Sequence, residues 1–531
     1  MEEKISILEV NNVDLPGRRF NGYDLMNSVK EDNIDIKQKV IYKQSKNDKV
    51  KQLLLNYEQM QMLEKLEEFE NHELSVHSNL SITSPALIRS QEYKDADIVH
   101  FHMFHNTKLS LISLLQICNE KKVVMSFHDP WSITGRCVHF GECTKWQTGC
   151  KNCENLNTLF EFSKDNCNIM WKLKKMIYEK INPDIVVSSK YMYNLVKQSP
   201  LTKHFTNVHI IPLGIDLNFF NDKIKKQEAR KKFNISETDI VLFLRAQNAL
   251  KGTGYVVEAL KKLQSNKKIT ILTCDEKNRF DEVKNRYNII DIGNMNDQEL
   301  LYAYNACDIF LMPSIGETFG MMAIEAMACE KPVIIFNNTA LPDVTFAPEC
   351  GVLVENKNSD KLMEAIERLI TNEEEREKRG KLGRKLCEEH YSIEKYNIRL
   401  INLYKDINKV KRLEQETLEL SEPEYNTSES IKIKNQLNKF TITNFKKNSK
   451  EYNMLVYENI DSIEGQINYS DWNVQNIINE YNNKLYDVIA HKKTNNIFIQ
   501  VKNAMALLIK DRSRLKNSIQ YKFNQIFKKK D

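Results

Sequence analysis

The sequence predicts an α/β protein with two doubly wound domains, each holding a parallel sheet between layers of helices. Short β-branched runs alternate with longer helical stretches over about the first 400 residues, as parallel strands and their crossover helices do. The chain has 531 residues, too many for one hydrophobic core. A charged stretch, NDKIKKQEARKKFN (221–234), interrupts the alternation near its middle and indicates a change of domain.

The first domain is expected to span 1–215. Its helical stretches include 49–74, an amphipathic, charge-laced segment that we expect to be a helix forming an insertion or outer cover. A strand followed by a turn at Gly214 is expected near its end. The other strands are expected at 5–10, 96–102, 122–127 and 183–189.

The second domain is expected to span 216–390 and to repeat the same pattern. Beyond it, 416–430 is polar and rich in breakers, as a linker is, and 431–531 predicts a basic, mainly helical extension. The strands of the second domain are expected at 239–246, 267–274, 288–293, 306–314, 331–337 and 351–356.

Composition narrows the class of protein. The formal net charge of +5 is small for this length, so nucleic acid is not expected as a partner. No run of about 18 uncharged apolar residues and no signal peptide is found, which favours a cytoplasmic protein. Eleven cysteines in a chain without an export signal favour reduced thiols or a metal site over a disulfide framework.

The segment GETFGMMAIEAMACEKPV (316–333) predicts a ligand site. It follows the apolar run IFLMPS (309–314), so Glu317 lies in a loop at the carboxyl end of a buried strand, where ligands bind in open α/β sheets. The helix that follows is expected to begin around Phe319. Its unpaired N–H groups near Gly320 and Met321 suit a phosphate group.

A second carboxylate, Glu325, lies one to two turns into that helix and is expected to face the same ligand and accept hydrogen bonds from sugar hydroxyls. The alternative is that Glu317 is a solvated loop residue and Glu325 a helix-surface charge. Glu325 interrupts the apolar run MMAI-AMAC, and this weakens the alternative.

A second candidate anion-binding site lies in FLRAQNALKGTGYVVEAL (243–260). Arg245 ends a predicted strand and Lys251-Gly252 precedes the next helix, so two cations flank one loop and suit a diphosphate. A Lys-Gly pair alone usually marks an ordinary loop. Its combination with Glu317 and Glu325 makes the diphosphate interpretation specific.

The Glu317-x7-Glu325 spacing, the Arg245…Lys251-Gly252 pair and IPLGID (211–216) together resemble family 4 of the retaining glycosyltransferases. The resemblance covers about the first 405 residues. It implies a GT-B fold, with the acceptor held by the first domain, the nucleotide-sugar by the second, and the reaction in the cleft between them. HYSIEKYNIRLINLYKDI (390–407) resembles that family's closing helix, so 391–415 is expected to return to the first domain.

The resemblance also implies roles for the residues. Glu317 would contact the donor sugar and face the reacting carbon, and Glu325 would hold the ribose hydroxyls. Arg245 and Lys251 would neutralise the pyrophosphate in place of a divalent metal, so no cofactor is required for catalysis. Transfer is expected to retain the anomeric configuration through an oxocarbenium-like state.

The first domain supplies further candidates. In DLPGRRFNGYDL (14–25), Gly22 at a helix start is the expected point of backbone approach to the donor, while Arg18 or Arg19 meets an anionic group or is merely solvated. His128-Asp129, at a strand end, falls where the family commonly places a residue beside the donor sugar. The block from there to the cysteines resembles members that build bacterial surface polysaccharides.

Four cysteines crowd the loop-rich segment 137–153. Cys137-x5-Cys143-x6-Cys150-x2-Cys153 suits a tetrahedral structural zinc site that staples a lid over the acceptor side. Buried free thiols or a disulfide are the alternatives. By contrast, Asp95-Ala96-Asp97 matches a short metal motif of another glycosyltransferase fold and is interpreted as a chance match.

The expected function is a hexosyl transfer from a nucleotide-sugar, UDP before GDP, to a glycan or lipid-linked acceptor in polysaccharide synthesis. A nucleotide-sugar epimerase of similar shape and a catalytically silent scaffold protein are the alternatives. Residues 505–530 form an amphipathic basic pattern that suits peripheral contact with an anionic membrane, or equally packing on the body or a partner chain.

Overall fold

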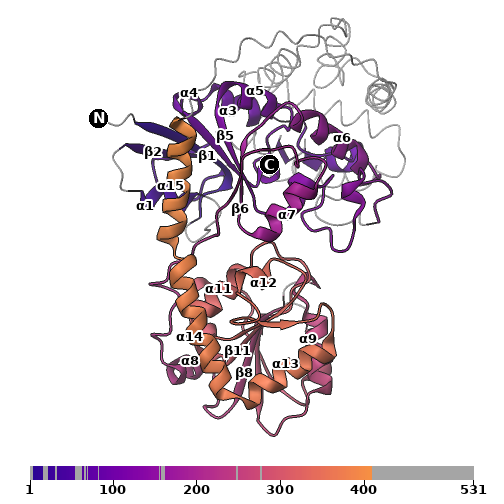
Figure 1. The fold of residues 1–531 in the computed structure, drawn as a ribbon, viewed down its shortest axis with the longest axis vertical. Coiled ribbons are helices and arrows are strands. Elements are labelled where there is room, and N and C mark those ends of the chain that lie inside the picture. The colour runs from indigo at the N-terminus through magenta and orange to yellow at the C-terminus, as the bar shows by residue number, and fades with distance from the viewer. Residues whose placement is uncertain are drawn as a thin grey trace, which may run out of the picture.

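The computed structural model describes residues 4–409, apart from 16–21, 30–32, 54–62, 65–66, 69, 80, 82, 155, 157–161, 247–248 and 275–277. Two α/β domains lie one above the other and are joined along one side by a pair of long helices (Figure 1). The closing residues 410–415, the linker and the basic extension expected from the sequence lie outside the described residues. No described helix is both long and apolar enough to cross a bilayer.

The first domain is built on a seven-stranded parallel sheet in the order β3-β2-β1-β4-β5-β6-β7. The four strands expected from β-branched runs and the strand before Gly214 are confirmed. The strands are β1 (Ile5–Val13), β2 (Ile34–Tyr42), β3 (Val50–Gln52), β4 (Ile98–His102), β5 (Lys122–Phe127), β6 (Asp184–Val187) and β7 (Val208–Ile210).

The expected helix over 49–74 is wrong at its start. Val50–Gln52 forms edge strand β3, which pairs in parallel with β2, and Val50 is fully buried. Three residues are too few for strand alternation to compete with the helical period of the sequence that follows. The end of the segment is a π-helical turn, η1 (Glu70–Leu74), and much of the rest lies outside the described residues.

The second domain holds a six-stranded parallel sheet in the order β10-β9-β8-β11-β12-β13. Every one of these strands falls within a run expected from the sequence. The inner strands β11 and β12 are continuously apolar because they are buried on both faces, whereas edge strand β10 is partly exposed. They are β8 (Ile240–Arg245), β9 (Ile269–Cys274), β10 (Asn288–Asp291), β11 (Ile309–Met312), β12 (Val333–Phe336) and β13 (Val352–Val354).

Helices cover the two sheets and connect their strands. Those of the first domain are α1 (Tyr23–Ser28), α3 (Thr83–Arg89), α4 (Gln91–Asp95), α5 (Ser113–Glu120), α6 (Cys167–Tyr178) and α7 (Lys190–Gln198). The following ones are α8 (Lys226–Lys232), α9 (Thr253–Lys262), α10 (Asp297–Ala306), α11 (Met321–Ala328), α12 (Leu341–Val344), α13 (Ser359–Thr371), α14 (Glu373–His390) and α15 (Ile393–Lys409).

Helix α15 crosses from the second domain to the first (Figure 1). At its start Ser392 forms a parallel bridge with Ile215. Gly214 is required beside this bridge, because a Cβ there would lie 2.7 Å from the Cα of Ile393. Further along, Tyr404 is fully buried against the first sheet. The helix therefore connects the two domains (Figure 1).

Candidate active site

The loop after β11 docks onto the first domain. Thr318 Oγ1 donates a hydrogen bond to the carbonyl oxygen of His128 at 2.7 Å, and Ser189 Oγ donates to the carbonyl oxygen of Thr318 at 2.7 Å. His128 follows β5, Ser189 follows β6 and Thr318 follows β11, so the carboxyl ends of strands from both sheets meet here, where open α/β sheets bind ligands. We call this junction the cleft. Sequence reasoning missed Thr318 and Ser189, because a hydroxyl bond between domains leaves no periodic signal.

Glu317 and Lys251 meet in this cleft. Lys251 Nζ lies 2.9 Å from Glu317 Oε2, and the two side chains are 26% and 17% exposed. Lys251 ends a short 3₁₀ turn, η5 (Ala249–Lys251), and Gly252 follows as the N-cap of α9 with φ of 74°. A Cβ on Gly252 would lie 1.9 Å from the carbonyl oxygen of Pro313, so glycine is required for this loop to approach β11.

Arg245 is the last residue of β8, as expected at a strand end. Its Nε atom is buried and has no hydrogen-bond partner in the described part of the chain. The guanidinium lies beside Cys274. Burial raises the pKa of the Cys274 thiol, and the positive charge of Arg245 offsets part of that rise. A buried guanidinium N–H without a partner is costly, and a bound anion would satisfy it.

Helix α11 begins at Met321, two residues later than expected. Gly320 is its N-cap, with φ of 107° and no side-chain cap, and this left-handed backbone postpones the first helical residue. A Cβ there would lie 2.4 Å from Leu341 Cδ2. The first N–H groups of α11 therefore lie next to the Glu317 loop and can bind an anion.

Glu325 is buried rather than exposed on the surface of α11, so the helix-surface alternative is wrong. It is 3% exposed, and Tyr304 Oη donates to its Oε2 at 3.0 Å. The same hydroxyl lies 3.2 Å from the carbonyl oxygen of Met322, which places the carboxylate near the first turn of the helix. Burial raises the pKa of Tyr304 well above its ordinary value, and the charge of the neighbouring Glu325 carboxylate raises it further. Glu317 and Glu325 thus have different immediate partners.

His128 and Asp129 lie in the cleft wall of the first domain. Asp129 accepts a hydrogen bond from Trp131 N at 2.8 Å, which caps the 3₁₀ turn η3 (Pro130–Ile133), and it lies 3.3 Å from His105 Nε2. The ring of His128 stacks on that of His102 with centroids 5.6 Å apart. Asp129 therefore has a structural task in addition to any contact with a ligand.

A buried lysine supports this wall. Lys174 is fully buried, and its Nζ donates to the carbonyl oxygens of Trp131 at 2.5 Å and Thr134 at 3.0 Å. It also lies 3.5 Å from the centroid of the Trp131 ring, which adds a cation–π attraction. Burial lowers the pKa of Lys174 to about 7.

His139 is a cleft residue that sequence reasoning missed. A Cβ on Gly316 would lie 3.3 Å from its Nδ1, so the cysteine-rich segment reaches the loop after β11. Desolvation lowers the pKa of His139, while Asp129 and Glu317 oppose that shift. Nothing in the spacing of VHFGEC distinguishes this histidine from an ordinary loop residue.

The four cysteines of 137–153 are half-buried free thiols, so the disulfide alternative is wrong. The backbone N–H of Gly135 donates to Cys150 Sγ at 3.2 Å. Burial raises the pKa of Cys150 to about 12 and that of Cys137 to about 11, with neighbouring cysteines adding to both shifts. Within the described ranges, no three of these sulfurs lie within 4.8 Å of one another.

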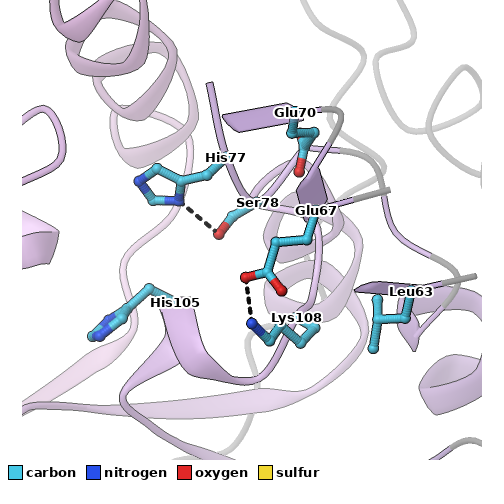
Figure 2. A pocket seen from close by; sticks show the side chains of 7 residues that line it. All are labelled: Leu63, Glu67, Glu70, His77, Ser78, His105 and Lys108. Atoms are coloured by element: carbon cyan, nitrogen blue, oxygen red, sulfur yellow. Dashed lines mark hydrogen bonds and ion pairs between the residues drawn. The ribbon is translucent and has the colours of Figure 1, made fainter. Parts of the chain in front are cut away.

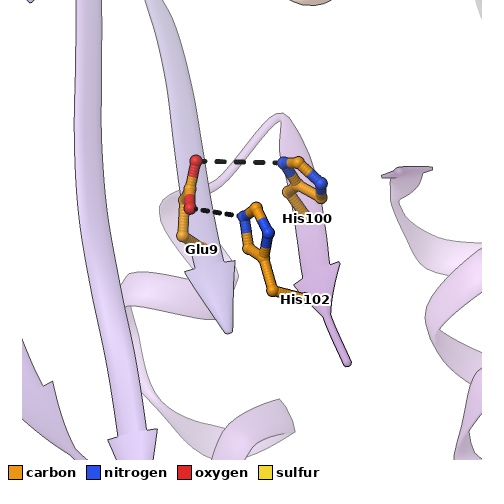
Figure 3. A group of neighbouring side chains, drawn as sticks. All are labelled: Glu9, His100 and His102. Atoms are coloured by element: carbon orange, nitrogen blue, oxygen red, sulfur yellow. Dashed lines mark hydrogen bonds and ion pairs between the residues drawn. The ribbon is translucent and has the colours of Figure 1, made fainter. Parts of the chain in front are cut away.

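One group of potential metal ligands does meet that distance. Glu9 on β1 and His100 and His102 on β4 offer ligand atoms within 4.8 Å of one another, and all three are fully buried (Figure 3). Gly22, expected to approach the donor, packs here instead, because a Cβ would lie 1.4 Å from Glu9 Oε2. The alternation in VHFH, with both histidines on one strand face, was the signal for this group.

A small pocket lies beside His105, the residue that contacts Asp129 (Figure 2). Its volume of about 20 Å³ leaves room for roughly one water molecule. It is too small for a sugar as it stands. The residues that line it are Leu63, Glu67, Glu70, His77, Ser78, His105 and Lys108. The candidate residues Arg18 and Arg19 and the segment 505–530 lie outside the described residues.

Known proteins resemble parts of this chain. Residues 225–386 match the family model described as "Glycosyl transferases group 1". The chain is 24% identical over 300 residues to an "Uncharacterized 41.2 kDa protein in cps region" of Klebsiella pneumoniae, covering 55% of this chain and 74% of that protein. It is 26% identical over 222 residues to the "Capsular polysaccharide biosynthesis glycosyltransferase CapM" of Staphylococcus aureus, covering 39% of this chain and 58% of CapM.

Solved structures share the fold. Anabaena Alr3699/HepE, crystallised in complex with UDP, superposes with a TM-score of 0.52 at 12% identity, covering 76% of this chain and all of that one. The two-domain arrangement is therefore the GT-B fold that the resemblance implied. The chain spans about half the length of several further curated relatives that it matches.

Proposed function

We propose that this chain is a retaining glycosyltransferase that moves a hexosyl group from a nucleotide-sugar to a glycan or lipid-linked acceptor. The observation that carries the proposal is that Arg245 ends β8 and Glu317 follows its neighbouring strand β11, with Lys251 Nζ 2.9 Å from Glu317 Oε2. Two cations and a helix N-terminus form a diphosphate site, and a carboxylate beside it can bind sugar hydroxyls. The match of 225–386 to group 1 glycosyltransferases supports it.

In this proposal, each cleft residue stabilises charge or orients the sugar. The Nε of Arg245, which has no partner among the described residues, and the Nζ of Lys251 bind the diphosphate, so that the leaving group is neutralised by protein cations. Glu317, released from Lys251, accepts hydrogen bonds from the donor sugar near its reacting carbon. Glu325 holds the ribose from the second turn of α11, and His128 contacts the sugar from the first domain.

The acceptor is proposed to be a growing bacterial polysaccharide or its lipid-linked precursor. The names of the Klebsiella and Staphylococcus relatives, one from a cps region and one a capsular glycosyltransferase, support this class. The UDP in the Anabaena structure supports a nucleotide-sugar donor, with UDP expected before GDP. Peripheral membrane contact through 505–530 stays a prediction from the sequence.

The donor is tested first, by thermal shift with a panel of UDP- and GDP-sugars. A ligand that binds only the folded state raises the melting temperature, so one nucleotide-sugar should raise it and the others should not. Glu317→Gln should keep this shift but lose transfer to acceptor, whereas Glu364→Gln, on the exposed face of helix α13, should keep both. Full transfer by Glu317→Gln would overturn the assigned mechanism.

The thermal shift, followed by analysis of the products, separates the alternatives. No shift with any donor supports the scaffold protein. A shift followed by conversion of the donor sugar to its epimer, with no acceptor present, supports the epimerase. Release of free nucleotide together with a longer acceptor, detected by mass spectrometry, supports the transferase.

For the cysteine segment we propose one structural zinc ion held by Cys137, Cys143, Cys150 and Cys153. Four free thiols in one loop-rich stretch, with a backbone N–H already donating to Cys150 Sγ, suit a closed thiolate site once the sulfurs draw together. We expect about one zinc per chain in purified protein and a lower melting temperature after chelation. Zinc-free protein with an unchanged melting temperature contradicts the proposal.

A further inference from the structure

His139 lies where the cysteine-rich segment of the first domain meets the second domain. Its neighbour there is Gly316, the residue before Glu317. A Cβ on Gly316 would lie 3.3 Å from His139 Nδ1 and 3.4 Å from Leu250 Cδ2. Leu250 precedes Lys251, whose Nζ lies 2.9 Å from Glu317 Oε2. The imidazole therefore adjoins both loops that carry the charged pair of the candidate active site.

The ring of His139 faces the charges of the cleft and not the thiols. The charged groups whose fields reach it are Asp129 of the first domain and Glu317 and Lys251 of the second. No cysteine among the described residues contributes, although Cys137 is only two residues away in the sequence. A histidine that served the cysteine cluster as a metal ligand would have the opposite orientation.

The ring nitrogens of His139 are available to a ligand. The residue is half-buried, and within the part of the chain that the structure describes neither nitrogen forms a hydrogen bond. Neither nitrogen is fully buried, so solvent reaches the ring. Ligand sites hold a small number of such polar groups, placed to orient what they bind.

The backbone around His139 is held in place. The N–H of Cys143 donates to the carbonyl oxygen of Phe140 at 2.9 Å, which closes a turn directly after His139. The ring of Phe140 packs on that of buried Trp146, with centroids 5.3 Å apart. A side chain on a backbone that is already ordered loses less entropy when it binds a ligand.

A second contact joins the same segment to the second domain. Glu142 Oε1 lies 2.5 Å from Lys357 Nζ, between β13 and α13. The pair is largely exposed, so it adds little stability by itself. Together with the approach of His139 to Gly316, it shows that the cysteine-rich segment reaches the loops that follow two strands of the second sheet.

We infer that His139 is a sugar-binding residue, which the cysteine-rich segment delivers into the cleft to hydrogen-bond a hydroxyl group of the sugar held there. An imidazole in either protonation state can donate to a hydroxyl oxygen. The carboxylates of Asp129 and Glu317 repel a phosphate group at this position but not a neutral hydroxyl. The inference rests on the proposed function for the identity of the ligand, and the sugar belongs to either the donor or the acceptor.

The test is footprinting of the full-length protein with diethyl pyrocarbonate, which modifies accessible imidazole nitrogens, read by mass spectrometry of its peptides. His139 should react in the free protein. The UDP- or GDP-sugar that raises the melting temperature most should protect it, whereas the matching free nucleoside diphosphate should not. His390, whose side chain is 45% exposed at the end of α14, should react equally in every sample.

His139→Ala gives the second measurement. If the donor sugar is the ligand, the variant should bind the nucleotide-sugar about 5-fold more weakly, as the loss of one hydrogen bond predicts, and the free nucleotide equally well. If the acceptor sugar is the ligand, the acceptor lengthened in the transfer assay should protect His139 instead, and its KM should rise by the same factor in the variant. His390→Ala should change neither constant.

The outcomes separate this inference from the proposed function. An unreactive His139 in the free protein overturns the inference whatever the enzyme does. Donor and acceptor that both bind without protecting His139, or unchanged constants in His139→Ala, overturn it and leave the proposed function standing. Stoichiometric zinc in the wild type that is lost in His139→Ala makes this histidine a metal ligand, which also overturns it. A protein that binds no nucleotide-sugar overturns the proposed function, and the inference falls with it.

Discussion

Lys251 Nζ lies 2.9 Å from Glu317 Oε2, which pairs the two residues that the proposed function assigns to different parts of the donor. Both side chains are partly exposed in the cleft, so the pair can open at modest cost. A diphosphate would replace the carboxylate on Lys251 and release Glu317 toward the sugar. The ion pair thus holds both groups close to where the reaction needs them.

Replacing Lys251 by methionine should weaken binding of the nucleoside diphosphate. A hydrogen bond to a charged group contributes about 1.5–3 kcal/mol, so the Kd should rise roughly 10- to 100-fold, measured by isothermal titration calorimetry. Lys262→Met removes a surface lysine that pairs with Asp360 and should leave the Kd unchanged. Equal affinities for wild type and Lys251→Met would remove Lys251 from the diphosphate site.

Thr318→Val should loosen the contact between the domains. The substitution keeps the shape of the side chain but removes the hydrogen bond to His128, while the backbone carbonyl that accepts from Ser189 remains. The loss of one such bond, about 1 kcal/mol, should increase the radius of gyration in solution scattering and lower turnover. A scattering curve identical to that of the wild type would show that the bond does not restrain closure.

Gly22→Ala should destabilise the first domain by more than the strain of placing alanine at a positive φ. Gly22 and Gly141 both have positive φ, at 75° and 56°, but a Cβ on Gly141 meets nothing within 4 Å. Gly141→Ala should therefore cost about 1–2 kcal/mol of unfolding free energy. Gly22→Ala also displaces the buried Glu9 carboxylate and should cost about 3 kcal/mol or more. Equal losses in chemical denaturation would contradict the close packing.

The sequence predicts the fold well where strands are buried on both faces. Strands β11 and β12 of the second sheet, IFLM and VIIF, are apolar and buried throughout, and both were predicted. The edge strand β10, NIID, is partly exposed and was also predicted. Strand β2, IDIKQKVIY, was missed because Lys37 and Lys39 interrupt its apolar positions. Lys39 is nevertheless buried and lies 2.8 Å from Glu92, a partner that only tertiary structure supplies.

The site was predictable in part, where its residues lie directly after a predicted strand. Glu317 and Lys251 follow strand ends with a spacing that the sequence displays, and the structure brings them together. His139, Thr318 and Glu9 contact residues that are far from them in the sequence. The local pattern around each of the three fits an ordinary loop or strand. Their partners on other elements, such as His128 for Thr318, are set by packing of the domains.

The pH dependence of stability should reveal Lys174. Its pKa is lowered from 10.5 to about 7 by burial, so between these values the unfolded chain binds one more proton than the folded chain. The contribution of Lys174 to the free energy of unfolding therefore rises as pH increases from 7 toward 10.5, by up to about 1.4 kcal/mol per pH unit. Below pH 7 the lysine is charged in both states, and the burial penalty is constant.

Lys174→Met has no such proton to lose, so the unfolding free energy of the wild type minus that of the variant should rise with pH from 7 to about 10. Tryptophan fluorescence during urea unfolding measures this in the first domain, where Trp131, Trp146 and Trp171 are buried. Lys175→Met, which removes an exposed lysine paired with Glu179, should give a flat difference. A flat difference for Lys174→Met as well would mean that Lys174 keeps an ordinary pKa in the folded protein, and that its contacts with Trp131 and Thr134 offset the cost of burying its charge.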